Sequence, residues 1–240
     1  MIDEIETEKN KNYENGISFI IPCKNEEKYI KDTVIEISKS VTDTIDYEIL
    51  IINDFSEDQT ENIAKELALN NTKIKFINNN IHLGFGGSFI KALKFVKKEF
   101  IYLIPGDNAV PSDVIKKMLI NINDFDLIFG IPVEIKKDRQ IHRKFFSKLF
   151  TIIVNIFFGQ KLKYYNGIGI IRTKVINSLN IKSNSPVFQA EIILKSLKLK
   201  LRYDQRSIIF IERKFGKSAI FNFNTIFRSV FDLLKIRLNY

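Results

Sequence analysis

Apolar runs and helical patterns alternate along the first half of the chain. Five runs are continuous and rich in β-branched residues: 17–22 (ISFIIP), 47–52 (YEILII), 73–77 (KIKFI), 100–104 (FIYLI) and 125–129 (FDLIF). Such runs are typical of strands buried on both faces. Between them, apolar residues recur at helical spacing over 30–37, 63–67 and 87–98. Strands separated by helices of this length need crossover connections. The sequence therefore predicts an α/β fold with a mainly parallel, Rossmann-like sheet and helices on both faces.

Beyond residue 130 this alternation weakens. Residues 166–172 and 207–211 fit strands, and residues 187–200 fit a helix. The apolar run 149–158 is shorter than the roughly 18–20 residues that a membrane-spanning helix needs. The second half is therefore expected to contain a few further strands and helices and no membrane-spanning helix.

The end of the chain shows a helical pattern with one apolar face. That face holds Phe223, Ile226, Phe227, Val230 and Leu234. The pattern predicts an amphipathic C-terminal helix over 219–240. We expect a flexible segment at 1–15 and one main domain at 16–218. The main domain is further divided into the halves 16–130 and 131–218.

The charge of the chain is unevenly distributed. Its formal net charge is +9, but residues 1–130 sum to −7, whereas residues 131–240 sum to +16 and hold every Arg. This asymmetry indicates an anionic partner for the basic half, whether nucleic acid, phosphate or an anionic membrane. A hydrophobic fraction of 45% excludes a disordered chain, and the single Cys23 excludes a disulfide framework and a cysteine-based zinc site.

Composition also bears on location. The polar, acidic residues 1–15 lack the basic start and apolar run of a secretory signal. A lone cysteine is typical of a reducing compartment. We therefore expect a cytoplasmic protein, peripheral on the cytosolic face of a membrane.

Polar side chains follow each predicted strand where it ends. The segments are 23–27, 53–58, 78–88 and 105–108. Open parallel sheets bind their ligands beyond the C-terminal ends of the strands. Acidic and amide side chains are therefore predicted to meet on one rim of the sheet and to form the ligand site there.

The order and spacing of these segments resemble the family 2 glycosyltransferases of GT-A fold. The matching segments are ISFIIPCKNEEKYI (17–30), YEILIINDFSEDQT (47–60), NNNIHLGFGGSF (78–89) and FIYLIPGDNAVP (100–111). NGIGIIR (166–172), FQAEIILKSL (188–197) and ERKFGKS (212–218) are similar to the dolichol-phosphate mannosyltransferase-like branch, which transfers sugars to polyprenyl phosphates. The resemblance covers roughly residues 17–218. It implies a nucleotide-sugar half at 16–130 and an acceptor half at 131–218.

The resemblance implies a binding site for a nucleoside-diphosphate sugar. Asp54, just past the second strand, matches the acid that contacts the base in the family. Pro22, Asn25 and Glu26 match the segment that lies against the nucleotide. The residues alone also permit a plainer interpretation, in which they turn the chain and cap the next helix.

Glycines between residues 84 and 88 suggest a loop that borders the donor. Gly86, Gly87 and Ser88 match such a loop in the family. Glycines allow a close approach of backbone to ligand, and a following helix N-terminus favours anions. The segment is not a dinucleotide fingerprint, because it follows the third strand and lacks the third glycine.

Asp107 is the predicted metal ligand and one of two predicted catalytic residues. A departing nucleoside diphosphate favours Mg²⁺ or Mn²⁺, which takes one or two protein carboxylates while the diphosphate supplies further oxygens. Asp107 matches the second acid of the Asp-x-Asp motif of the family, whereas Pro105 stands at the first and Ala109 two positions beyond. Asp107 is thus expected to act as a lone protein carboxylate; as a plainer alternative, PGDN is also an ordinary turn.

The residues needed on the acceptor side depend on the nucleophile. A sugar hydroxyl needs a general base, and Glu191, near Gln189 at the start of a helical pattern, is the candidate. A lipid phosphate is already ionised and needs cations that orient it. The candidates for that contact are Arg143, Arg172, Gln189, Arg213, Lys217 and Ser218. Solvated surface charges are the alternative.

These features predict an inverting, Mg²⁺- or Mn²⁺-dependent glycosyltransferase of hexosyltransferase type. The acceptor expected from the resemblance is a polyprenyl phosphate, undecaprenyl or dolichyl, in cell-envelope or glycan biosynthesis. Residues 149–158 and the tail helix, flanked by bases, suit helices that lie in the interface of an anionic membrane. If they are core or dimer helices instead, a homo-oligomer is the alternative.

Other functions stay open from the sequence. One is transfer to a saccharide hydroxyl of a surface glycan, with Glu191 as base. A second is non-catalytic binding of nucleic acid or membrane through the basic half. We expect no nucleic-acid partner, because Asp54 and Asp107 would repel phosphates unless a cation intervenes. A third is a transferase-like protein that binds donor without turnover, suggested by Pro105 and Ala109.

Overall fold

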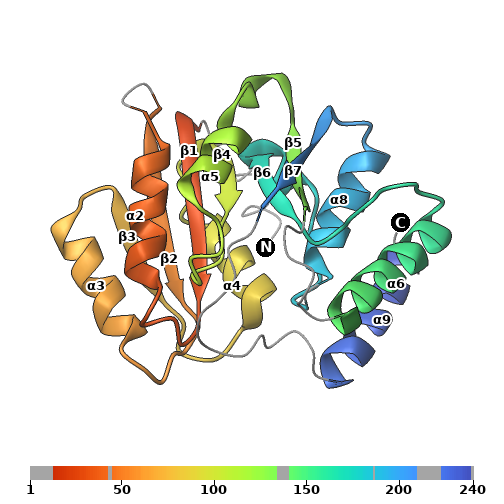
Figure 1. Cartoon of the computed structure of the whole chain (residues 1–240), viewed down its shortest axis with the longest axis horizontal. Helices are drawn as coiled ribbons and strands as arrows, with labels where there is room; N and C mark the ends of the chain where they lie inside the picture. Colours follow the sequence, from red (N-terminus) through yellow and green to blue (C-terminus); the bar gives the residue numbers. More distant parts are fainter. Residues whose placement is uncertain (1–12, 43–44, 134–140, 186, 210–222, 239–240) are drawn as a thin grey trace, which may run out of the picture.

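The computed structural model describes residues 13–42, 45–133, 141–185, 187–209 and 223–238. Seven strands form one sheet in the order β3-β2-β1-β4-β6-β5-β7 (Figure 1). The strands are β1 Glu14–Cys23, β2 Tyr47–Asn53, β3 Ile74–Asn78, β4 Lys98–Leu103, β5 Leu127–Pro132, β6 Ile168–Arg172 and β7 Tyr203–Ile208. Among these described strands β6 alone runs antiparallel to its neighbours β4 and β5. The predicted α/β fold with a mainly parallel sheet is confirmed.

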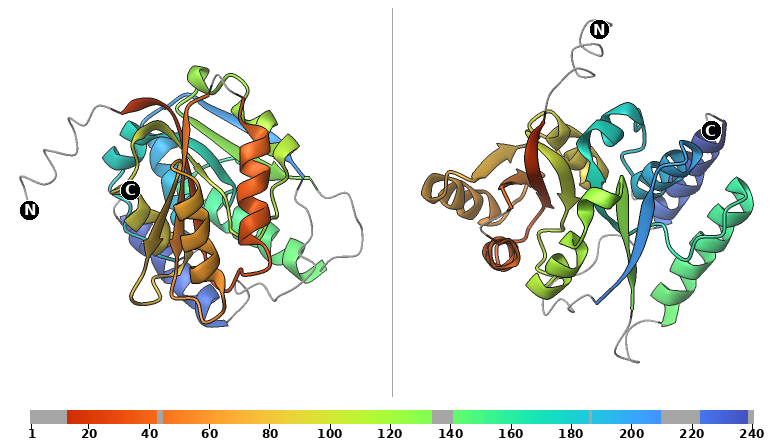
Figure 2. Two further views of the ribbon diagram at one scale, coloured as in Figure 1. Left: turned by 90° about the vertical axis from the view of Figure 1, so that its left-hand side faces the viewer. Right: turned by 90° about the horizontal axis from the view of Figure 1, so that it is seen from above.

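Helices cover both faces of this sheet (Figure 2). They are α2 Ile30–Ser40, α3 Thr60–Asn70, α4 Gly84–Leu93, α5 Ser112–Leu119, α6 Ile141–Phe158, α7 Thr173–Ser178, α8 Phe188–Lys198 and α9 Phe223–Leu238, with a 3-10 turn at Ile122–Asp124. Helices α2, α3 and α5 pack in one apolar cluster, and helices α4, α6, α7, α8 and α9 contribute to a second on the other face. No helix in the described part of the chain has the length and hydropathy to cross a bilayer.

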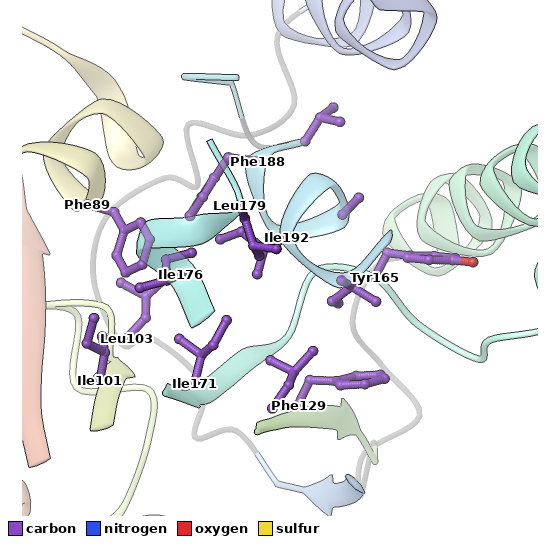
Figure 3. Packing of buried hydrophobic residues seen from close by; sticks show 14 of the residues in the cluster. Phe89, Ile101, Leu103, Phe129, Tyr165, Ile171, Ile176, Leu179, Phe188 and Ile192 are labelled. Carbon is purple, nitrogen blue, oxygen red and sulfur yellow. The ribbon is translucent and has the colours of Figure 1, made fainter. Parts of the chain in front are cut away.

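The apolar runs are buried on both faces because alternate side chains enter different clusters. In β1, Phe19 and Ile21 join the cluster on the α2 side, whereas Ile20 between them joins the cluster on the α8 side. Figure 3 shows the second cluster, in which the rings of Phe89 and Phe188 lie 5.5 Å apart between centroids. This two-sided burial explains why these strands lack an alternation of polar and apolar residues.

Two predicted boundaries differ from the structure. The seventh strand, expected at 207–211, lies at 203–208, because its polar residues (YDQRS) suit an edge strand whose surface is half exposed. Within the tail predicted as a helix over 219–240, the structure describes helix α9 at Phe223–Leu238. Leu234 of its predicted apolar face is exposed, whereas Leu233 and Ile236 are buried. The sheet is continuous across residue 130, since β6 lies between β4 and β5.

The order of the strands fixes where a ligand can bind. From β1 the chain moves outward to β2 and β3, and then returns to place β4 on the other side of β1. Such a switch opens a crevice at the C-terminal ends of the two strands on either side of it. Asp54 after β2 and Asp107 after β4 therefore flank the end of β1.

Candidate active site

The loops that follow β1 and β2 are bonded to each other. The Asn25 amide N donates to Ser56 Oγ over 3.0 Å, and the Glu57 amide N donates to Asn25 Oδ1 over 2.8 Å. The Glu26 amide N donates to Thr60 Oγ1 over 2.7 Å. Asn25 is exposed and has a φ of +56°, a conformation that Asn tolerates better than most residues, and Glu26 is buried. The structure therefore places Asn25 and Glu26 at the C-terminal end of the sheet, where hydrogen bonds join their loop to the loop after β2.

Asp54 closes the loop between β3 and α4. The residue is only 4% exposed. The amide N of Leu83 donates to Oδ1 over 2.8 Å, and that of Gly84 donates to Oδ2 over 2.9 Å. Asn79 Nδ2 also donates to Oδ1 over 2.9 Å, and His82 Nδ1 lies 2.8 Å from Oδ2. Asp54 is thus a turn-forming residue and an acid of the predicted site at once.

These donors determine the ionisation of Asp54. Burial by itself raises the pKa of the Asp54 carboxyl. The hydrogen bonds from the Leu83 N–H and the Asn79 amide, together with the nearby His82, lower it by more, so the net pKa lies below its ordinary value. Asp54 therefore carries a full negative charge at neutral pH. Contact of Asp54 with a nucleobase stays a prediction.

The segment expected to form a glycine-rich loop is helical in the structure. Residues 84–93 form helix α4, and Gly86, Gly87 and Ser88 are buried within it. A Cβ on Gly86 would lie 2.8 Å from the Asn184 carbonyl oxygen, and one on Gly87 would lie 2.9 Å from Leu83 Cβ. These glycines allow the helix to pack closely against its neighbours. The predicted contact of Gly86, Gly87 and Ser88 with the donor stays a prediction.

Helix α2 fixes the loop that carries Asp107. Thr33 Oγ1 donates to the Gly106 carbonyl oxygen over 3.1 Å and accepts from the Asn108 amide N over 3.0 Å. A Cβ on Gly106 would lie 2.8 Å from Cys23 Cβ, so glycine lets this loop reach the end of β1. Asp107 is half-buried, and its Oδ1 accepts from the Ala109 amide N over 3.2 Å.

Cys23 and Pro22 belong to the wall between the two loops. The Cys23 side chain is buried, and burial raises the pKa of its thiol, so it packs as a neutral apolar group, as the sequence predicts. Pro22 is buried in β1, and its carbonyl oxygen accepts from the Gly106 amide N over 3.4 Å. Both residues lie at the end of β1 next to the loop of Asp107, and contact of Pro22 with the nucleotide stays a prediction.

The oxygens at the end of β4 suit a hard cation. Asp107 supplies a carboxylate, and the neighbouring Asn108 has a buried Oδ1 with no hydrogen-bond partner among the described residues. Within the described ranges no group of three or more His, Cys, Asp or Glu residues surrounds a point in space. Such a donor set fits Mg²⁺ or Mn²⁺, which take one or two carboxylates while water and phosphate oxygens complete the shell.

Glu191 lies inside the protein. Its side chain is 1% exposed and accepts from the Ser183 amide N over 2.9 Å, with Lys195 Nζ 2.7 Å away. Ser183 Oγ in turn donates to Asp232 Oδ2 of α9 over 3.0 Å. The carboxylate therefore positions the loop before α8, and this geometry favours a structural role over proton abstraction. Its catalytic role stays a prediction, as does that of half-buried Gln189 in the first turn of α8.

Arg172 forms ion pairs near the start of β4. Its guanidinium pairs with Glu99 and, over 3.2 Å, with Asp126, and it lies 4.6 Å from the centre of the Phe100 ring. Because β6 runs antiparallel to β4, Arg172 at the end of β6 pairs with Phe100 near the start of β4. It therefore lies at the opposite end of β4 from Asp107. This geometry favours a structural role for Arg172, and its predicted phosphate contact stays a prediction.

The other predicted acceptor residues are not placed by the structure. The side chain of Arg143 in α6 and the residues Arg213, Lys217 and Ser218 lie outside what the structure describes. Their roles stay predictions.

Sequence reasoning missed three residues whose side chains bond to the loops of the site: Thr33, Asn79 and Thr60. Asn79 Nδ2 donates to Ser88 Oγ over 2.9 Å as well as to Asp54. A polar residue in a predicted helix or loop carries no signal of its distant partner. The only available hint was the number of short polar side chains near the predicted strand ends.

Comparisons with known proteins agree with this geometry. The model of the family described as Glycosyl transferase family 2 matches residues 18–179. The putative glycosyltransferase CsbB of Bacillus subtilis is 25% identical over 223 residues, which are 90% of this chain and 65% of that protein. The dolichyl-phosphate beta-glucosyltransferase ALG5D of Trichomonas vaginalis is 24% identical over 153 residues, 58% of this chain and 46% of that protein. The chain thus spans about half to two thirds of the length of these relatives.

A solved structure shares the fold. Glucosyl-3-phosphoglycerate synthase from Mycobacterium tuberculosis, in complex with Mn²⁺, UDP-glucose and phosphoglyceric acid, aligns with a TM-score of 0.71 at 15% identity. The alignment covers 99% of this chain and 84% of that one. With the family model matching well over half of its residues, the chain belongs to glycosyl transferase family 2, with the GT-A fold that its sequence predicts.

Proposed function

We propose that the protein transfers a sugar from a nucleoside-diphosphate sugar to an acceptor, with inversion at the anomeric carbon. The observation that carries the proposal is the placement of two carboxylates, Asp54 after β2 and Asp107 after β4, on either side of the end of β1 at the switch point. The solved structure with UDP-glucose and Mn²⁺ supports such a donor and metal for this fold.

The site residues have separate roles in this reaction. Asp107, with Asn108 beside it, would hold Mg²⁺ or Mn²⁺ against the diphosphate of the donor, where the metal neutralises the charge of the leaving group. Thr33 keeps that loop in place through Gly106 and Asn108. An acceptor oxygen attacks the anomeric carbon in line. The bond from that carbon to the diphosphate oxygen breaks, and its electron pair leaves with the nucleoside diphosphate.

We propose a polyprenyl phosphate as the acceptor. An ionised phosphate oxygen needs no general base, and Glu191, the candidate for such a base, is buried and bonded to the loop before α8. The name of the Trichomonas vaginalis relative, a dolichyl-phosphate glucosyltransferase, points to the same class of acceptor. A saccharide hydroxyl acceptor would require Glu191 to exchange these contacts for one with substrate.

We propose that the protein acts at an anionic membrane surface, on the cytosolic face. Helices α6 and α9 support this proposal. The two helices lie side by side (Figures 1 and 2). On each helix, three of the exposed apolar residues lie at positions i, i+3 and i+7, which fall on one stripe. The residues are Leu149, Ile152 and Ile156 in α6, and Phe231, Leu234 and Leu238 in α9. Exposed bases accompany them: Lys148, Lys235 and Arg237. Apolar stripes with nearby bases suit the interface of an anionic bilayer.

Turnover assays test the reaction and the acceptor together. Purified protein is offered a panel of nucleoside-diphosphate sugars with Mn²⁺ or Mg²⁺, and either a polyprenyl phosphate or a neutral oligosaccharide. We expect release of the nucleoside diphosphate with one donor and the lipid phosphate. Turnover with the oligosaccharide alone would overturn the acceptor, and no turnover with any pair would overturn the reaction.

Vesicle binding tests the membrane surface. Ile156, 75% exposed, and Leu238, 86% exposed, are changed together to Asp, with Leu69→Asp on α3, also 86% exposed, as the matched control. We expect the double variant to bind vesicles with anionic lipid roughly tenfold more weakly, since it loses apolar contacts and gains negative charge. Unchanged vesicle binding with a loss of dimer would assign the stripes to self-association.

A further inference from the structure

Phe55 has an unusual backbone and an exposed ring. It follows Asp54 directly after β2, its φ is +61°, and the residue is 50% exposed. Six non-glycine residues in the described part of the chain have a positive φ, and four of them are Asn, which tolerates this region. The other two are Phe55 and Lys200. A bulky aromatic residue in the left-handed region is strained, and such strain concentrates at functional sites.

Bonds on both sides of Phe55 hold this conformation. The Asp54 amide N donates to the Cys23 carbonyl oxygen over 2.8 Å, and its carboxylate accepts from the amide of Leu83. On the other side, Ser56 Oγ accepts from the Asn25 amide N over 3.0 Å. The two loops therefore fix the residues before and after Phe55 and force its backbone into place.

Packing does not account for the ring. Phe55 belongs to neither apolar cluster formed by the described residues, and none of the aromatic contacts found among them involves it. In the sequence it lies between Asp54 and Ser56, whose side chains bond to neighbouring loops. A half-exposed aromatic ring held there against backbone strain has a flat face available for a ligand.

We propose that the Phe55 ring stacks on the nucleobase of the donor. This inference rests on the proposed function and adds the residue that binds the base. Asp107 and Asn108 place the diphosphate at the end of β4, and β2 lies two strand spacings away, about 10 Å, on the other side of β1. An extended nucleotide with its diphosphate at β4 reaches toward β2 with its base. Because every base has a π-face, stacking strengthens binding without selecting the base.

Replacement by glycine separates this role from a structural one. Phe55→Gly removes the ring and relieves the strain of the positive φ. We expect affinity for UDP and for GDP, measured by calorimetry with Mn²⁺ present, to weaken by about tenfold each relative to wild type. The melting temperature of Phe55→Gly should stay unchanged or rise by about a few degrees. A matched control is Lys200→Gly, which relieves a φ of +53° at the end of α8 and should leave affinity unchanged.

A spectroscopic variant reports contact directly. The chain contains no Trp, so Phe55→Trp supplies its sole indole. UDP should quench its emission, whereas the emission of Leu69→Trp, exposed on α3, should not change with UDP.

Three outcomes would overturn the stacking role. One is nucleotide affinity in Phe55→Gly equal to wild type together with no quenching in Phe55→Trp. Another is a fall in the melting temperature of Phe55→Gly with unchanged affinity per folded molecule, which would assign the ring to packing. The third is a wild-type protein that binds none of the common nucleoside diphosphates, which removes the proposed donor itself. The first two leave the proposed function standing, so the two failures are distinguishable.

Discussion

Both ends of the sheet carry acidic side chains, but the partners of these side chains differ between the two ends. At the edge where the parallel strands begin, Lys98 contacts Glu14 and Asp46, and Arg172 contacts Glu99 and Asp126. Each of these carboxylates is opposed by a full positive charge. The ion pairs connect the starts of β1, β2, β4 and β5. The acidic residues at this end of the sheet therefore have a structural role.

At the other end, two carboxylates accept hydrogen bonds from backbone N–H groups, which are neutral donors. Asp54 accepts from the backbone N–H groups of Leu83 and Gly84, and Asp107 accepts from that of Ala109. Neutral N–H dipoles stabilise a carboxylate without cancelling its charge. The difference teaches that an acidic residue can recruit a cation where the fold satisfies it with N–H groups, and cannot where a Lys or Arg already neutralises it.

The largest effect that tests this comparison is expected at Asp107. Asp107→Asn keeps the shape of the loop and removes the charge that holds the metal. We expect turnover to fall roughly 100-fold or more, since stabilisation of the leaving group is lost. The melting temperature should change by no more than about 2 °C, because Asn has nearly the shape of Asp and the side chain is only half-buried. Turnover within about threefold of wild type would remove Asp107 from the chemistry.

Asp54 is expected to affect stability and its dependence on pH. Asp54→Asn leaves N–H groups of the loop partly unsatisfied and should cost about 2 kcal/mol in the free energy of unfolding. Because the folded pKa of Asp54 is lowered, its contribution is fully present above about pH 4 and is lost as the pH falls through that lower pKa. The acid sensitivity of unfolding should therefore be smaller in the variant.

Urea denaturation at several pH values measures this effect. Asp113→Asn, an exposed carboxylate at the start of α5, is the control and should change neither quantity. Equal acid sensitivity in Asp54→Asn and wild type would contradict the assigned bonds.

Arg172 is expected to matter for stability alone. Arg172→Ala breaks two ion pairs and the contact with the Phe100 ring, which should lower the free energy of unfolding by about 1–2 kcal/mol. The value of kcat/KM should not change, because the residue is at the edge away from the rim. Arg202→Ala, which removes a more exposed partner of Asp126, should cost less. A drop in kcat/KM without loss of stability would favour the phosphate contact that the sequence suggested.

The smallest effect is expected at Glu191. Glu191→Gln keeps the shape of the side chain and weakens its bonds to Ser183 and Lys195. If the acceptor is an ionised phosphate, kcat should fall by less than about threefold with an unchanged pH profile. A general base would instead cost about 10²–10⁴-fold and move the acid limb of the profile. Steady-state rates from pH 5.5 to about 9 decide between the two.

The sequence predicts the sheet well and the partners of individual side chains poorly. Runs such as 17–22 identify their strands because both faces are buried, and β-branched residues leave few alternatives. Asp54 and Asp107 could be found because strand ends follow directly from the strands. Arg172 could not be placed, because the antiparallel direction of β6 depends on its neighbours in the sheet rather than on its own residues.

Close packing explains the other failure of sequence reasoning. The glycines near residue 86 suggest an open loop, yet their reason lies in a distant backbone, since Gly86 faces the carbonyl oxygen of Asn184. Glu191 similarly has a catalytic residue type but bonds to the amide of Ser183. In both cases a long-range contact, which leaves no local pattern, decides the role.

Metal-dependent binding of the nucleotide tests the central claim most directly. Calorimetric titration of UDP and GDP is carried out on wild type, Asp107→Asn and Arg172→Ala, with Mn²⁺ and with chelator. We predict that wild type and Arg172→Ala bind one nucleotide about tenfold or more tightly with Mn²⁺ than with chelator, and that Asp107→Asn loses this gain. Equal binding by all three proteins in the presence and absence of Mn²⁺ would contradict a cation-recruiting rim at the ends of β1 and β4.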